Sequence, residues 1–100
     1  MCGFVGLIGT AAVAPQLVLG LQSIQHRGQD AAGAATFDGK RWHLTKDLGM
    51  VSSVLTEDRI HGMTGTAGIA HVRYPTAGTI STQQAAQPFL TRQPGILLAH

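Results

Sequence analysis

Residues 1–9 read MCGFVGLIG, and Cys2 is the only cysteine of the 100-residue chain. The apolar, partly β-branched run at residues 4–8 predicts a buried strand, which would hold the preceding residue more firmly than a free terminus does. If Met1 is removed, Cys2 carries a thiol and a free α-amine, a group whose pKa is ordinarily about 7.7–8.0. Cys2 is therefore a candidate nucleophile beside its own base, although a lone cysteine is also often a small buried apolar residue.

The composition indicates a chain whose apolar surface packs against further polypeptide. Apolar residues make up 44% and charged residues only 12% of the sequence, whereas about 25% charged residues is usual. The net charge is +2, and the Lys and Arg residues are scattered, which argues against a nucleic-acid partner. A single cysteine excludes an internal disulfide and a thiolate zinc cluster. Because a free thiol fits a reducing compartment, we expect a cytoplasmic protein.

A membrane segment is the weaker interpretation of the N-terminal quarter. Residues 1–25 carry no charged side chain, and a run of this length is compatible with a transmembrane helix or a signal peptide. However, no basic residue precedes the run, and glycines, Pro15 and several polar residues interrupt it. We therefore expect no membrane partner.

The hydrophobic pattern predicts a helix and a hairpin after the first strand. Pro15 suits the first turn of a helix, an apolar stripe that includes Leu17 and Leu21 follows it, and Gly28 suits the residue just past its end. Residues 38–39 are Asp-Gly, a strong hairpin signal, between expected strands at 34–37 and 40–45. Residues 46–49 are expected to form a turn.

The second half of the chain is predicted to return to helix and then to strands. Residues 50–63 are expected to be mainly helical, with Thr56 as an N-cap. Residues 65–73 alternate as a strand with His71 and Arg73 on one face, and residues 96–100 predict a further buried strand. His43 and His61 are expected to be isolated surface histidines.

Two polar segments are candidate parts of a site. Residues 26–33 read HRGQDAAG, which suits either a helix exit leading into a tightly packed strand or a loop at the mouth of a site. Residues 71–78 read HVRYPTAG, where the guanidinium of Arg73 could bind a carboxylate; an ordinary surface ion pair is the alternative. The sequence has no P-loop, no spaced set of metal ligands and no carboxylate pair.

Three stretches together, MCGFVG at 1–6, HRGQDAAG at 26–33 and HVRYPTAG at 71–78, resemble the amidophosphoribosyltransferase family of class II glutamine amidotransferases. In that family an N-terminal cysteine is the nucleophile. The resemblance implies an α+β fold, a four-layer αββα N-terminal-nucleophile hydrolase sandwich. It also implies that the thiolate of Cys2 attacks the side-chain amide of glutamine.

The same resemblance implies roles for the two internal motifs. Arg73 matches the residue that binds the α-carboxylate of glutamine, and Tyr74 and Thr76 match its neighbours in the glutamine pocket. Arg27 and Gly28 match a segment that lies near the nucleophile, and we expect them to support it.

The resemblance also implies what lies outside these residues. Residues 1–100 are expected to be the incomplete N-terminal part of a glutamine amidotransferase domain, without the phosphoribosyltransferase domain in which ammonia converts phosphoribosylpyrophosphate to phosphoribosylamine, the first step of purine synthesis. No cofactor is expected in this segment, magnesium is expected in the phosphoribosyltransferase domain, and family members are homo-oligomers. The family continues after His100 with an Asn-Gly-Asn oxyanion element, so we expect little or no glutaminase activity from this chain alone. A non-catalytic glutamine-binding or interaction module is the alternative.

Overall fold

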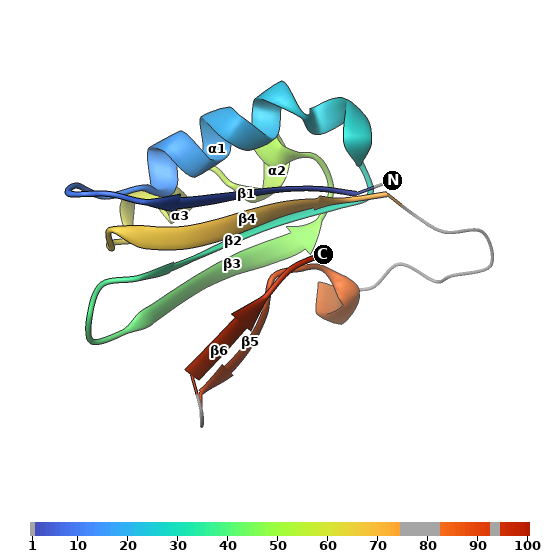
Figure 1. Ribbon diagram of the computed structural model, residues 1–100. Helices are drawn as coiled ribbons and strands as arrows, with labels where there is room; N and C mark the ends of the chain where they lie inside the picture. The colour runs from blue at the N-terminus through green and yellow to red at the C-terminus, as the bar shows by residue number, and fades with distance from the viewer. Residues whose placement is uncertain (1, 75–82, 93–94) are drawn as a thin grey trace.

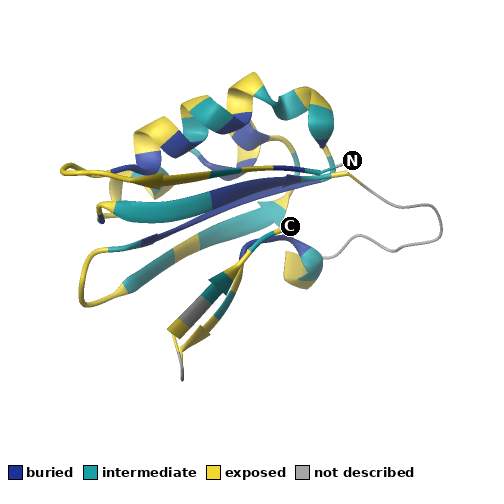
Figure 2. Ribbon diagram, in the orientation of Figure 1, coloured by how far each residue is buried: buried dark blue, intermediate teal, exposed yellow. Residues whose placement is uncertain are grey.

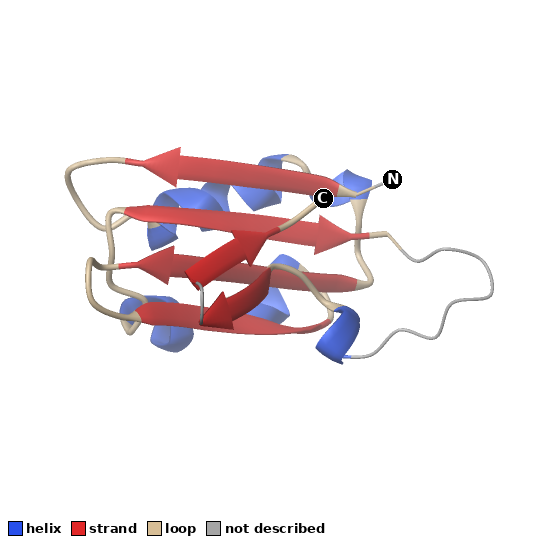
Figure 3. Cartoon of the chain, turned by 60° about the horizontal axis from the view of Figure 1, so that its bottom comes forward, coloured by secondary structure: helices blue, strands red, loops and turns tan. Residues whose placement is uncertain are grey.

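A computed structural model describes residues 2–74, 83–92 and 95–100. These residues form an α+β fold in which helices cover one face of a four-stranded sheet and a β-hairpin crosses the other face (Figures 1 and 3). The strands of the larger sheet are β1 (Gly3–Ile8), β2 (Ala31–Phe37), β3 (Trp42–Leu48) and β4 (Ala67–Arg73). The smaller sheet pairs β5 (Phe89–Arg92) with β6 (Gly95–Leu98). The helical elements are α1 (Ala14–Ser23), η1 (Gln25–Arg27), α2 (Val51–Val54), α3 (Glu57–His61) and η2 (Gln83–Ala85).

The larger sheet has the strand order β1-β4-β2-β3, and every neighbouring pair is antiparallel. The register pairs Gly3 with Val72 across β1 and β4, and Gly33 with both His71 and Lys46 across β4, β2 and β3. The end of β4 and the beginnings of β1 and β2 therefore meet at one end of the sheet. The described parts of the three motifs, residues 2–6, 26–33 and 71–74, lie at or next to that end.

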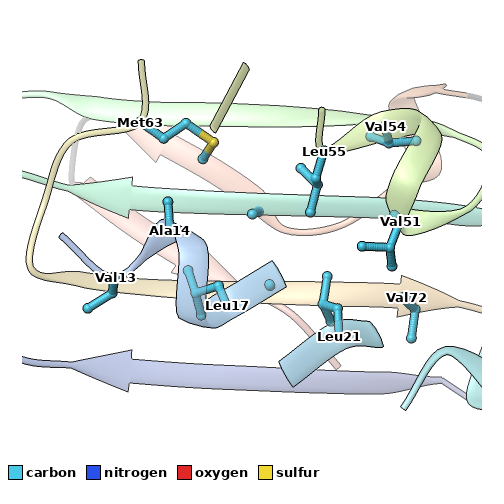
Figure 4. Close-up of a cluster of buried hydrophobic side chains, with 12 residues drawn as sticks. Val13, Ala14, Leu17, Leu21, Val51, Val54, Leu55, Met63 and Val72 are labelled. Atoms are coloured by element: carbon cyan, nitrogen blue, oxygen red, sulfur yellow. The ribbon is translucent and has the colours of Figure 1, made fainter. Parts of the chain in front are cut away.

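The hydrophobic core lies between the helices and the first face of this sheet (Figure 4). Leu17 and Leu21 of α1 are fully buried, as the apolar stripe predicted. Ala70 and Val72 of β4 point to the same core, so the predicted alternation of β4 is confirmed. The remaining core members come from the start of α1, from β2, from α2 and the residue after it, and from the segment after α3: Val13, Ala14, Ala32, Ala34, Val51, Val54, Leu55 and Met63.

The second face of the sheet is only partly covered, and here the expectation of buried terminal strands is wrong. Phe4 is 64% and Ile8 86% exposed in β1, and Leu98 is 57% exposed in β6, as Figure 2 shows along β1. β1 is an edge strand, and only its residues that face α1, such as Val5, are packed against the core. The apolar residues on its other side have no layer above them among the described residues.

Two local predictions are corrected by pairing. Residues 46–48 continue β3 rather than forming a turn, because Lys46 and Leu48 pair with Gly33 and Ala31; the chain turns at Gly49, whose φ is +120°. His43 is not isolated, because its Nε2 lies 2.9 Å from Asp38 Oδ2 and 3.0 Å from Thr64 Oγ1.

Other local predictions are confirmed. Asp38 and Gly39 lie in the turn at residues 38–41 between β2 and β3, where Asp38 Oδ1 accepts hydrogen bonds from the backbone N–H groups of residues 40 and 41. β3 therefore begins at Trp42, two residues later than predicted. The hydroxyl of Thr56 accepts from Arg59 N at 3.5 Å and caps α3. His61 is exposed, as expected. Within the described ranges, no helix combines the length and the apolar character needed to cross a bilayer.

Candidate functional site

Cys2 lies immediately before β1, at the end of the sheet where β4 finishes. Its thiol is free and partly buried. The backbone N–H of Tyr74, the residue after β4, lies 3.5 Å from Cys2 Sγ and donates to it. The antiparallel pairing of β1 with β4 thus brings residues 2 and 74 together.

Arg27 holds the backbone of the candidate nucleophile. It is the last residue of η1, and its Nε donates to the carbonyl oxygen of Cys2 at 3.0 Å. Gly3 leaves room for this side chain, because a Cβ at Gly3 would lie 3.3 Å from Arg27 Cδ. Residue 27 therefore contacts residue 2 directly.

Position 28 needs a glycine because there is no room for a side chain, not because of its backbone conformation. Its φ of −174° and ψ of 131° are extended, so any residue could adopt them. However, a Cβ at Gly28 would lie 2.5 Å from Arg73 C and 2.7 Å from Arg73 O. The absence of a side chain at residue 28 thus lets the end of η1 pack directly against the end of β4, which brings the second and third motifs into contact.

Arg73 forms an ion pair with Asp30, in which Nη1 lies 2.9 Å from Oδ2. Both side chains are mostly buried, at 11% and 16% exposed, and Asp30 N also donates to the carbonyl oxygen of Arg73 at 3.0 Å. The ion pair anticipated as the alternative is therefore present, but it is internal to the motifs rather than on an open surface. A guanidinium has five N–H donors in a fixed fork, which suits it to bind more than one acceptor.

Two residues of this site were not found from the sequence. Asp30 stood in the HRGQDAAG stretch without an assigned role, because its partner lies 43 positions away. Gln25 bridges two segments: its Nε2 donates to Gly28 O at 2.6 Å and its Oε1 accepts from Val51 N at 3.0 Å. Only its position in the polar run before residue 28 could have suggested it.

A cavity of about 480 Å³ opens beside this cluster and is lined by His26, Gln29, Asp30 and Tyr74. Tyr74 is 55% exposed, so its ring borders open space. Thr76, the other predicted pocket residue, lies outside the described residues. A larger cavity of about 860 Å³ lies between α1 and the α2–α3 segment. Cys2 and Arg73 line neither cavity, but their partners Tyr74 and Asp30 line the smaller one.

The described part of the chain contains no group of three or more His, Cys, Asp or Glu side chains that could hold a metal ion. The site contains the Cys2 thiol with a backbone donor, Arg27 bound to the carbonyl oxygen of Cys2, and the buried Arg73–Asp30 pair next to an open cavity. This arrangement suits nucleophilic attack on a small polar substrate.

The chain is similar over its whole length to curated amidophosphoribosyltransferases. It is 49% identical over 105 residues to that of Saccharomyces cerevisiae, 46% over 101 residues to that of Pseudomonas aeruginosa and 46% over 102 residues to that of Escherichia coli. In each case the whole chain is matched, and it spans about 20% of the relative's length. No family model matches the chain.

Solved structures show the same likeness. The glutamine phosphoribosylpyrophosphate amidotransferase from B. subtilis, complexed with ADP and GMP, superimposes on 91% of this chain with a TM-score of 0.77 and 31% identity. A structure described as the allosteric regulatory enzyme of purine biosynthesis covers 92% of the chain with a TM-score of 0.81 and 34% identity. The match spans 19% of each of those chains. The predicted resemblance is thereby confirmed.

Proposed function

We infer that this chain is part of an amidophosphoribosyltransferase and that it carries the nucleophile that releases ammonia from glutamine. Two observations support the inference: the chain is 41–49% identical to several such enzymes along its whole length, and its three motifs meet at Cys2. The observation that carries the proposal is the pair of contacts at Cys2. Arg27 Nε lies 3.0 Å from the carbonyl oxygen of Cys2, and Tyr74 N lies 3.5 Å from its Sγ.

The proposed reaction begins once Met1 has been removed and the α-amine of Cys2 is free. The thiolate attacks the side-chain amide carbon of glutamine, and the α-amine carries the proton to the leaving nitrogen. The C–N bond breaks, ammonia leaves, and water then hydrolyses the γ-glutamyl thioester to glutamate. Arg27 keeps the Cys2 backbone in place, and the N–H of Tyr74 offsets negative charge on sulfur.

We assign substrate binding to the 480 Å³ cavity, which is lined by Asp30, the ion-pair partner of Arg73. We propose that the guanidinium of Arg73, oriented by Asp30, binds the α-carboxylate of glutamine, with Tyr74 and Thr76 beside it and Gly28 supporting the backbone. In the longer protein the ammonia displaces pyrophosphate from phosphoribosylpyrophosphate. Magnesium belongs to that phosphoribosyltransferase domain. A cytoplasmic location and a homo-oligomeric state are part of the same proposal.

The proposal extends to the fold and to the activity of these residues alone. The β5–β6 hairpin is the beginning of the second sheet of an αββα sandwich, and the partly exposed second face of the first sheet packs against that sheet. Because the resemblance places the oxyanion element after His100, and loss of one oxyanion donor lowers kcat by about 10²–10³, we expect residues 1–100 alone to hydrolyse glutamine very slowly.

The test is covalent labelling of the chain by the glutamine analogue diazo-oxo-norleucine, followed by intact mass and peptide mapping. The expected result is loss of Met1 and one adduct on Cys2, in which Sγ replaces dinitrogen. Iodoacetamide, which needs no glutamine pocket, serves as the control for thiol access. Selective labelling by the analogue supports a glutamine site. Labelling by iodoacetamide alone, or an analogue adduct that persists in Cys2→Ala, contradicts it and favours a non-catalytic module.

A further inference from the structure

Lys46 is a half-buried charged residue for which the proposed reaction has no use. It lies in β3, where it is the register partner of Gly33 in β2. Its Nζ donates to the carbonyl oxygen of Ala86 at 2.7 Å and lies 4.9 Å from the centre of the Phe89 ring. Ala86 follows η2 and Phe89 begins β5, and Figures 1 and 3 both place η2 beside β3. Lys46 therefore joins the η2–β5 segment, residues 83–92, to the larger sheet.

The partners of the Lys46 amine are neutral groups. A carbonyl oxygen and an aromatic ring both attract an ammonium ion, but none of the ion pairs in the described part of the chain includes Lys46. Burial without a carboxylate disfavours the charged form, and it lowers the pKa of Lys46 from its ordinary 10.5. The neutral amine can still donate an N–H to Ala86 O while its lone pair stays free. Lys46 therefore has the chemistry of a nucleophilic amine.

A cavity of about 340 Å³ is lined by Leu44, Lys46, Gln83 and Gln84. Ligand pockets usually have about 300–1,000 Å³, so this one suits a compact molecule rather than a large cofactor. Gln83 and Gln84 are exposed, which leaves the cavity open to solvent. Their side-chain amides carry N–H donors suited to the oxygen atoms of a phosphate or a carbonyl, and no carboxylate lines the cavity to repel an anion. The cavity therefore suits a small anionic molecule with several acceptor oxygens.

We propose that the ε-amine of Lys46 is an acylation site for small acyl phosphates, and that acylation loosens the η2–β5 segment from the larger sheet. The neutral amine attacks the carbonyl carbon of the acyl phosphate. The C–O bond to phosphate breaks, and inorganic phosphate leaves with the electron pair of that bond. The nitrogen then loses a proton to water, and the product is an amide. The step needs no oxidant or reductant, and it does not depend on the reaction proposed at Cys2.

Acylation changes both contacts that Lys46 makes. The amide carries no charge, so the attraction to the face of the Phe89 ring is lost. It keeps a single N–H, and the acyl group must find space beside Ala86, which is fully buried. The backbone oxygen of Gln87 also packs against Gly33, at the place that a Cβ would take. Because this second contact remains, we expect the segment to loosen without leaving the sheet.

The first test compares the two lysines of the unaltered full chain. The chain is incubated with acetyl phosphate near neutral pH, and peptide mapping measures acetylation at Lys46 and at Lys40, which is exposed in the turn between β2 and β3. Adducts at the N-terminal residue are mapped separately. We expect acetylation of Lys46 to be at least about fivefold faster than that of Lys40, because more of its amine is neutral. In concentrated urea the two rates should become equal. A Lys46 rate at or below that of Lys40 in the folded chain overturns the acylation site.

The second test measures the loosening by hydrogen exchange of the amides of residues 86–92. We expect exchange there to be roughly fivefold faster in the acetylated chain and in Lys46→Gln, which is uncharged like the acylated lysine. Lys46→Arg, which keeps a cation, and Lys40→Gln should exchange at the unaltered rate. Unchanged exchange in both the acetylated chain and Lys46→Gln overturns the loosening. If Lys46→Gln also loses the protection of α1, the acetylated chain decides, and the first test uses no variant. If diazo-oxo-norleucine does not label Cys2, the proposed function fails while both tests of Lys46 still stand.

Discussion

Replacement of Gly28 by alanine tests whether the close packing of η1 against β4 holds the residues around Cys2 in place. The new Cβ would lie 2.5, 2.7 and 2.9 Å from Arg73 C, O and N, whereas a relaxed contact between carbon atoms is about 3.5–4.0 Å. The two segments must therefore separate by about 1 Å. Overpacking typically destabilises by about 1–3 kcal/mol, and a clash with backbone atoms cannot be relieved by rotating a side chain, so the upper part of that range applies.

The expected net effect is smaller than the clash alone. Alanine at a compatible backbone conformation stabilises by about 0.4–1 kcal/mol through the unfolded chain, and Gly28 is extended. We therefore expect Gly28→Ala to lower the free energy of unfolding by about 2 kcal/mol, measured by urea unfolding. The displacement also moves Arg27 from the Cys2 carbonyl, so labelling of Cys2 by diazo-oxo-norleucine should slow.

Gly62→Ala is the matched control. Gly62 has a φ of −82°, and the nearest atom to its Cβ would be Arg59 O at 3.8 Å, so alanine there should be neutral or slightly stabilising. Equal stability of the two variants would refute the packing argument. A destabilised Gly28→Ala that is labelled at the normal rate would refute the link between this contact and the nucleophile.

Three further predictions follow from the core and from buried or hydrogen-bonded polar groups. Leu21→Ala removes a fully buried side chain and should destabilise by roughly 3–5 kcal/mol in urea, whereas Leu19→Ala, at a side chain 63% exposed, should change stability by less than about 0.5 kcal/mol. The hydrogen bond from His43, then those from the backbone, hold the pKa of Asp38 well below its usual range, so Asp38→Asn should lower the thermal midpoint at pH 7. This difference should begin to shrink as the pH falls below about 4, the ordinary pKa of Asp, and should vanish only at a pH below the lowered pKa of the folded state. Burial lowers the pKa of His71 from its ordinary 6.5, so the unfolded chain binds the proton more readily than the folded chain does. The free energy of unfolding should therefore fall as the pH drops below 6.5. His71→Gln should flatten this pH dependence, and an unchanged slope would show that His71 is not its source.

The uneven burial of the sheet agrees with the composition. The chain has 12% charged residues, and the described second face exposes Phe4 and Ile8 on β1. Both features are consistent with the proposal above that further polypeptide packs on this face. The chain spans about 20% of the length of these curated relatives.

Local pattern was sufficient for most of the secondary structure. The stripe of Leu17 and Leu21, the Asp-Gly turn at 38–39 and the cap at Thr56 each depend on neighbours within a few positions, and each is found in the structure. The extension of β3 to Leu48 was missed because the length of a strand depends on the strand that it pairs with. Here that partner is the alanine- and glycine-rich β2. The isolation predicted for His43 failed for a similar reason, since one of its contacts, Thr64, is 21 positions away.

The sequence by itself determined which family the chain resembles and which residues are candidates for its chemistry, because a cysteine at position 2 and two contiguous motifs are properties of the linear chain. Only the tertiary structure decided how these residues support one another. The antiparallel register places Tyr74 N at Cys2 Sγ, and the missing side chain of Gly28 lets η1 pack against Arg73. Long-range contacts also pair Asp30 with Arg73, and His71 with the main chain of His100. Such contacts join residues dozens of positions apart, and only the packing of the strands and helices determines which of them meet.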